Sequence, residues 1–268
     1  MNRLHSSSRR VSLWAISTLM IAVLGVGHAA GSSFVINIQP GPGLLGNQAA
    51  LDAFQRAANT WSSRIDDDIT VNIAADLVDM GAGSTVGTTS SSYFFATEPN
   101  EFRDVMVADA ADEPDDAIVG FLPDMTNFTA ILPDGFSLNR LPPEEGGHAL
   151  MSATKANLKA LGFSAALLDS LDQGAADGTI NFNSQFSFDF DNSDGVDFTK
   201  IDFESAAAHE IGHTLGFMSI VDDIDFALDN SLAGGVYPTT LDAFRFENGV
   251  AGHDPNTSAD FQAFPRYL

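Results

Sequence analysis

The spacing of hydrophobic residues predicts a strand, a helix and a second strand in the first part of the chain. Residues 34–40 (FVINIQP) are rich in β-branched and aromatic residues and end at a proline and glycine turn, which is typical of a short strand. In residues 47–65 the apolar side chains recur every three or four positions, which predicts an amphipathic helix of about four turns. Residues 68–77 (DITVNIAADL) return to the strand pattern. This order predicts a βαβ unit and a partly parallel sheet.

Later segments predict a loop, two short helices and another strand. Residues 81–92 (GAGSTVGTTSSS) are small and polar and predict a mobile loop. The apolar positions in residues 151–161 and 164–171 predict two short helices. Residues 179–191 (TINFNSQFSFDFD) alternate apolar and polar side chains, which predicts a strand with one buried face. We therefore expect one domain of the α/β (α+β) class, built on a mixed, twisted sheet.

The first 29 residues have the order of a secretory signal peptide. A basic start with three arginines precedes an apolar run over residues 11–26, and small residues around Ala29 offer a cleavage point. The apolar run is short for a membrane span, and no stop-transfer pattern follows it. We expect an exported protein, secreted or held in the cell envelope, with no membrane span after signal removal and residues 30–268 as its mature domain. The alternative is a short N-terminal anchor that stays uncleaved.

The composition limits the partners and the possible metal ligands. The chain has 36 acidic and 12 basic residues, and loss of residues 1–29 removes three arginines and no acid, so the net charge moves from −24 to −27. Such an acidic surface repels phosphate backbones and anionic lipids, which disfavours binding to nucleic acid or to a membrane surface. Because there is no cysteine, a transition-metal site must use histidine with aspartate or glutamate. The histidines outside residues 1–29 are His148, His209, His213 and His253.

Residues 206–219 (AAAHEIGHTLGFMS) contain the spacing H-E-x-x-H. Because residues four apart lie on one face of a helix, His209 and His213 can present both imidazoles to one ion. Glu210 stands beside the first of these ligands, where it reaches a metal-bound water rather than the metal. Zinc lowers the pKa of such a water, and the glutamate accepts its proton. The spacing therefore predicts a zinc site for hydrolysis.

Both ends of this helix are marked in the sequence. Thr199 or Asp202 can cap its N-terminus, and Glu204 lies where a negative charge interacts favourably with the helix dipole. Gly216 comes three residues past His213, where a left-handed residue commonly ends a helix. We expect the chain to leave the helix sharply at this glycine and to return later residues toward the metal.

The motif and the sequence before it resemble the metzincin clan of zinc metallopeptidases. Residues 207–217 (AAHEIGHTLGF) look like the active-site helix of that clan and are most similar to its leishmanolysin-like branch and to a family of exported bacterial metalloproteases. Residues 188–213 (FDFDNSDGVDFTKIDFESAAAHEIGH) resemble the same bacterial family. The clear similarity covers residues 180–225, with a weaker similarity around Trp61.

The resemblance implies a metzincin-like zincin catalytic domain with an N-terminal helix and an active-site helix. In such a domain His209 and His213 bind Zn²⁺, and Glu210 is the general base. The substrate would be a polypeptide, bound extended across a cleft near an edge strand. The alternative is a catalytically inactive surface or binding protein that keeps the fold with an incomplete metal site. The presence of Glu210 favours the enzyme, because a binding site needs no base.

The source of a third zinc ligand is open. Most metzincins have a histidine three residues past the glycine of the motif, where this chain has Ser219. The leishmanolysin-like branch uses a downstream Ser-His-Trp segment followed by a methionine turn, and neither follows Ser219 here. The ligand can come from a segment beyond Leu268, from Asp222 or Asp223, or from His253. We expect a chain whose C-terminal part is incomplete, with Asp222 and then His253 as the next candidates.

A calcium site is a separate hypothesis. Residues 189–197 (DFDNSDGVD) hold four aspartates, whose carboxylates could bind Ca²⁺. Their spacing is out of register for an EF-hand loop, so a solvated turn before the active-site helix is the simpler interpretation.

Overall fold

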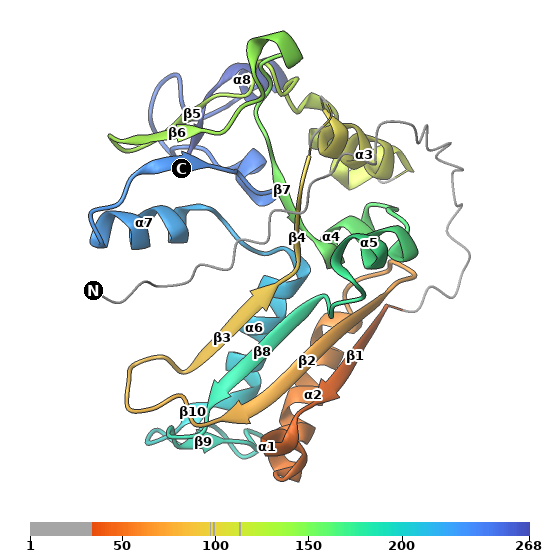
Figure 1. Ribbon diagram of the computed structural model, residues 1–268, viewed down its shortest axis with the longest axis vertical. Coiled ribbons are helices and arrows are strands. Elements are labelled where there is room, and N and C mark those ends of the chain that lie inside the picture. Colours follow the sequence, from red (N-terminus) through yellow and green to blue (C-terminus); the bar gives the residue numbers. More distant parts are fainter. Residues whose placement is uncertain (1–33, 97, 99, 113) are drawn as a thin grey trace.

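The computed structural model describes residues 34–268 apart from residues 97, 99 and 113 (Figure 1). The predicted signal peptide, residues 1–29, lies outside the described residues. The fold is mixed α/β, as the sequence predicts: a sheet covered by helices forms the lower part in Figure 1, and short helices and strand pairs form the upper part. No helix in the described ranges is long and apolar enough to cross a bilayer.

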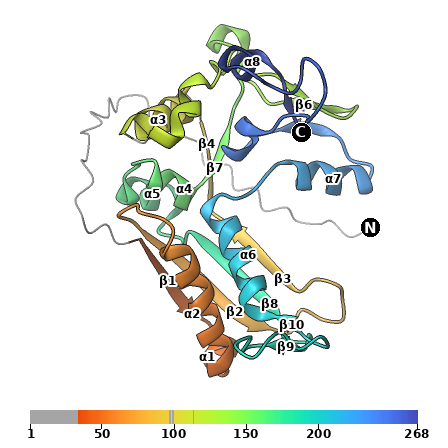
Figure 2. The same cartoon turned by 180° about the vertical axis from the view of Figure 1, so that it is seen from behind.

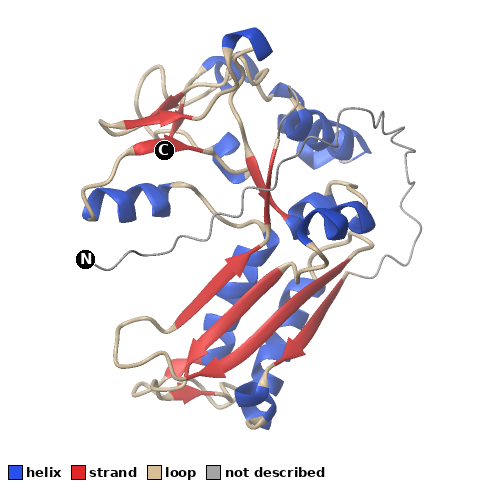
Figure 3. Cartoon of the chain, viewed as in Figure 1, coloured by secondary structure: helices blue, strands red, loops and turns tan. Residues whose placement is uncertain are grey.

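A four-stranded mixed sheet forms the framework of the lower part (Figure 3). Its strand order is β1-β2-β8-β3; β1, β2 and β8 are parallel, and β3 runs antiparallel to β8 at one edge. The predicted βαβ unit and partly parallel sheet are therefore confirmed. The strands are β1 Val35–Pro40, β2 Thr70–Val78, β8 Gly178–Asn183 and β3 Gly87–Ser91.

Two helices, α2 (Gln48–Ser62) and α6 (Phe203–Leu215), lie side by side on one face of this sheet (Figure 2). The buried face of α2 consists mainly of alanines, which allow the two helices to approach closely. At the closest point Trp61 donates a hydrogen bond to the carbonyl of Ala208 at 2.9 Å. A Cβ added at Gly212 would lie 3.2 Å from the Trp61 ring, so a larger residue there would require the ring to shift. This packing fixes α6, the helix that carries the motif.

The predicted loop over residues 81–92 is wrong in its second half, because residues 87–91 form the edge strand β3. The alternation of apolar and polar residues that normally marks a strand is absent, since the inward residues are a glycine, a threonine and a serine that face α6 at short range.

The single strand predicted over residues 179–191 is also wrong. It divides into β8 and β9 (Phe188–Asp189), because the Asn183 side chain accepts a hydrogen bond from the backbone N–H of Gln185 and so forms a turn.

The upper part is held by short strand pairs around its own apolar cluster, which includes Phe102, Leu122 and Phe128. The two short helices predicted between residues 151 and 171 are present as α4 and α5. The remaining helices and strands are α1 Pro42–Leu45, β4 Tyr93–Phe95, α3 Glu101–Asp109, β5 Ala130–Ile131, β6 Phe136–Leu138, β7 Ser152–Thr154, α4 Lys155–Ala160, α5 Ala165–Asp172, β10 Ile201–Asp202, α7 Val221–Asp229, β11 Gly234–Val236, α8 Ser258–Ala263 and β12 Arg266–Tyr267.

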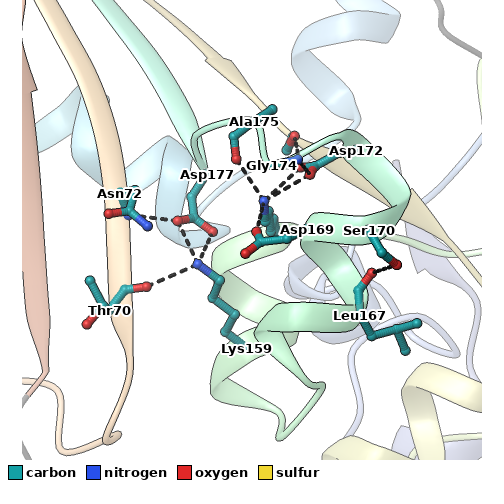
Figure 4. Close-up of polar contacts among 12 residues, drawn as sticks. Thr70, Asn72, Lys159, Leu167, Asp169, Ser170, Asp172, Gly174, Ala175 and Asp177 are labelled. Carbon is teal, nitrogen blue, oxygen red and sulfur yellow. Dashed lines mark hydrogen bonds and ion pairs between the residues drawn. The ribbon is translucent and has the colours of Figure 1, made fainter.

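A buried ion pair joins α4 to the sheet (Figure 4). The Lys159 ammonium lies 2.7 Å from the carboxylate of Asp177 and donates to the carbonyl of Thr70 at 3.1 Å. Asp177 is fully buried and also accepts a hydrogen bond from the backbone N–H of Asn72 at 2.7 Å. A buried charge is tolerated only when it is paired and hydrogen-bonded, so this network ties α4 to β2 and to the start of β8.

We predict that Asp177→Asn destabilises the protein strongly, because it leaves the buried Lys159 charge without a counter-charge. Breaking a buried pair in this way typically costs about 3–5 kcal/mol of unfolding free energy. The matched control is Asp169→Asn: the Asp169 side chain is 52% exposed, and its buried partner Lys155 keeps the carboxylate of Asp172 at 2.8 Å, so that charge stays paired and we expect a clearly smaller loss. Urea unfolding of the parent and of the two variants measures both losses of unfolding free energy. Equal losses in the two variants would contradict the structural role of Asp177.

Candidate metal centre

Local sequence signals set the two ends of α6 as expected. The Asp202 carboxylate accepts a hydrogen bond from the backbone N–H of Glu204 at 3.1 Å, so Asp202 is the N-cap, and Thr199 is not. The helix ends at Gly216, which has a left-handed φ of 104°. A side chain at this φ is strained, so glycine is the residue that lets the chain turn away directly after the motif.

His209 and His213 converge on one point beside α6. Their Nε2 atoms are 3.0 Å apart, and the two rings stand nearly perpendicular at 82°. The Nδ1 atom of His213 lies 3.1 Å from the carbonyl oxygen of Phe217. A carbonyl only accepts, so this contact places the proton on Nδ1 and leaves the Nε2 lone pair facing His209.

The spacing of this pair matches that of two zinc ligands. Two imidazole nitrogens at the usual zinc distance of about 2.05 Å lie roughly 3.3 Å apart in tetrahedral geometry, close to the observed separation. Metal-bound histidines are commonly oriented by a hydrogen bond from their other ring nitrogen, as the Phe217 carbonyl does here at Nδ1 of His213. The side chain of His209 is exposed and that of His213 is partly buried, so the point between them is open to solvent. Imidazole nitrogen is among the ligands that a borderline-soft divalent ion such as zinc prefers.

Glu210 points from α6 toward the edge strand β3. Its Oε2 atom accepts a hydrogen bond from the hydroxyl of Thr89 at 2.6 Å, and the side chain is partly buried. None of the described residues donates a hydrogen bond to the second oxygen, Oε1. This oxygen is therefore available to accept a hydrogen bond from a water molecule. Glu210 therefore lies next to the first histidine with one oxygen held and one available.

Ser219, at the position where most metzincins have the third histidine, is used for structure. Its hydroxyl donates to the Asp242 carboxylate at 2.6 Å. Asp242 is fully buried and also accepts from the backbone N–H groups of Ile220 at 3.0 Å and Thr239 at 2.8 Å. Asp242 therefore anchors the segment after α6. Sequence reasoning missed it, although Thr239 and Asp242 have the T-x-x-D spacing of a capping box and exchange hydrogen bonds.

The structure does not bring the three candidate ligands to the histidine pair. Asp222 and Asp223 lie in the first turn of α7. His253 is engaged elsewhere, with its Nδ1 2.7 Å from a carboxylate oxygen of Glu247. Within residues 34–268, excluding the gaps, no three His, Asp or Glu side chains form a group that could hold a metal. The source of a third ligand, including a segment beyond Leu268, stays a prediction.

Two groups near the end of α6 have shifted pKa values. Desolvation, followed by repulsion from Asp222 and Asp242, raises the pKa of the Asp223 carboxyl above its usual value. Desolvation and the negative charge of Asp223 raise the pKa of Tyr93 to about 12, against a smaller opposite effect of a hydrogen bond with Ser91. The Tyr93 hydroxyl contacts the sulfur of Met218. It is therefore protonated at neutral pH and can act as a donor but not as a base.

The acidic turn before α6 uses its carboxylates to hold its own backbone. Asp189 accepts from the backbone N–H groups of Asp191 at 3.3 Å and of Asp197 at 2.8 Å. Hydrogen bonds from Ser193 and Thr199 lower the pKa values of Asp191 and Asp197, respectively. These contacts are those of a self-bonded turn, and the described aspartates here form no metal-binding group. Calcium binding stays an untested prediction.

No family model matches the chain, and no curated protein and no solved structure matches it either. The resemblance to metzincins over residues 180–225 is therefore a prediction that depends on the residues themselves and on the geometry described above.

We predict that His209→Ala and His213→Ala each abolish most zinc binding, because each removes one of two converging nitrogen donors. Asp222→Ala, His253→Ala and Ser219→Ala should leave the zinc affinity close to that of the parent, since these side chains lie outside the pair or are bonded elsewhere. Competition with a chromophoric chelator measures the affinities. Loss of zinc from Asp222→Ala or His253→Ala would identify that residue as a ligand and contradict the assignment.

Proposed function

We propose that this protein is an exported zinc metalloendopeptidase with a metzincin-like catalytic domain. The observation that carries the proposal is the juxtaposition on α6 of two imidazole Nε2 atoms 3.0 Å apart and a glutamate with one carboxylate oxygen available. The helix end at Gly216, the Asp202 cap and the mixed sheet beneath α6 are consistent with this class. The motif in residues 207–217 supports the same conclusion from sequence.

The residues of the chain have distinct roles in this proposal. Zinc, when bound, would polarise the scissile carbonyl and lower the pKa of a coordinated water. His209 and His213 would hold it, and the Phe217 carbonyl keeps His213 in the tautomer that leaves Nε2 free. Glu210 accepts the proton of the attacking water at Oε1 and returns it to the amine of the leaving group. One carboxylate thus serves as base and then as acid.

The substrate in this proposal is an extended polypeptide. β3 is an edge strand, and one of its side chains contacts Glu210 directly. A chain segment that pairs with a sheet edge is held by main-chain hydrogen bonds, which suit a peptide of many different sequences. A peptide bound along β3 would therefore pass close to the proposed base. The chain's charge of −24 makes nucleic acid an unfavourable ligand.

The second candidate is an inactive, metzincin-like binding protein. It is favoured by one observation: the part of the chain that the structure describes groups no third metal ligand with the histidine pair. The two candidates differ in the consequence of changing Glu210. A binding protein needs no proton acceptor there, whereas the enzyme depends on it.

We predict that Glu210→Gln keeps bound zinc but loses ~10²–10⁴-fold in the rate of peptide hydrolysis. The amide has the same size but cannot accept a proton from water. Asp225→Asn on α7 is the matched control, since it removes one exposed carboxylate away from the motif. Hydrolysis of a quenched fluorescent peptide by the full chain, with zinc content measured in parallel, checks both. A zinc-loaded parent that hydrolyses no peptide would favour the binding protein instead.

A further inference from the structure

The edge strand β3 contacts the motif helix through one face of small residues. Alternate residues of a strand point the same way, and Gly87, Thr89 and Ser91 are less exposed than the two residues between them. The Ser91 hydroxyl donates to the backbone carbonyl of His213 at 3.3 Å, and the Thr89 hydroxyl lies 3.1 Å from the backbone carbonyl of Glu210. This face of β3 therefore follows α6 along the turn that contains the motif.

The same face also shapes the surroundings of the Glu210 carboxylate. The Thr89 hydroxyl donates to Oε2 at 2.6 Å, a short, charge-assisted contact between residues 121 positions apart. A Cβ added at Gly87 would lie 3.0 Å from Oε1 and 3.0 Å from the ring of Phe182. Threonine therefore binds one carboxylate oxygen, and glycine two positions earlier leaves room for the other.

We propose that Thr89 is a positioning residue for Glu210, with Gly87 providing the clearance that its free oxygen needs. This inference rests on the proposed function for the role of Glu210. A glutamate side chain has several rotamers, and holding one of them in advance lowers the cost of reaching the reactive arrangement. The hydrogen bond occupies Oε2, so Oε1, which lies beside Gly87, is the single oxygen left as the proton acceptor. Thr89 acts through Glu210 and need not touch the substrate.

Three variants of β3 test this role in the zinc-loaded full chain. Thr89→Val keeps the shape but removes the hydroxyl, and we expect kcat to fall on the order of tenfold with KM little changed. Thr89→Ser keeps the hydroxyl and should restore most of kcat. Thr88→Val is the matched control, since its side chain lies on the exposed face of the same strand. Zinc affinity and thermal unfolding should be the same in all of them.

Crystal structures of the metal-free parent and of Thr89→Val give a readout that does not depend on activity. We expect one Glu210 conformer in the parent and a displaced or divided carboxylate in the variant. A parent that hydrolyses no peptide would contradict the proposed function, while the crystallographic comparison would still show whether Thr89 holds Glu210. An active parent with an unchanged kcat in Thr89→Val, or an unmoved Glu210, would overturn the inference.

A second route covers the case in which Thr89→Val does not fold. Gly87→Ala places a methyl group 3.0 Å from Oε1 and 3.0 Å from the Phe182 ring while the Thr89 hydroxyl is kept, and we expect a lower kcat from it. Gly83→Ala is its control, because a Cβ there meets nothing within 4 Å. Equal kcat values for these two variants would also overturn the inference.

Discussion

The close packing of α6 against α2 and β3 is the constraint on which the candidate site depends. On one side the Trp61 ring reaches Gly212 and the carbonyl of Ala208, so the helix is fixed at the middle of the motif. On the other side the hydroxyls of Thr89 and Ser91 reach its backbone and side chains. Gly212 and Gly87 have the smallest possible side chain where the Trp61 ring and the Glu210 carboxylate come close. A helix held from both sides presents its two imidazoles and its carboxylate at defined positions in advance of any ligand.

The segment that leaves the helix is fixed by a different interaction. The buried carboxylate of Asp242 gathers the Ser219 hydroxyl and two backbone N–H groups, so the chain after Gly216 is tied to the upper part of the molecule. The same segment supplies the Phe217 carbonyl that orients His213. The site thus lies where the helix of the lower part continues into the upper part. Ser219 therefore has a structural role at the position where most metzincins have their third histidine.

The sequence predicted those parts whose signal is local. Strands β1 and β2 and helices α2 and α6 have clear periodicity, and Asp202 and Gly216 mark the ends of α6. Edge strand β3 was missed because its inward side chains are small and polar where a helix approaches, so hydrophobic alternation cannot reveal it. Asp242 was missed because the T-x-x-D spacing with Thr239 does not reveal its other partners, Ser219 and Ile220, which lie about 20 positions away along the chain. The motif predicts two ligands and a base, whereas no local pattern predicts a third ligand.

The central claim is that His209 and His213 bind one zinc ion together. X-ray absorption spectroscopy at the zinc edge, on protein loaded with one equivalent of zinc, tests it directly. The account predicts scattering from two imidazole rings with zinc–nitrogen distances of about 2.0–2.1 Å, and from one ring after His213→Ala. A zinc spectrum without imidazole scattering, or one that His213→Ala leaves unchanged, would contradict it.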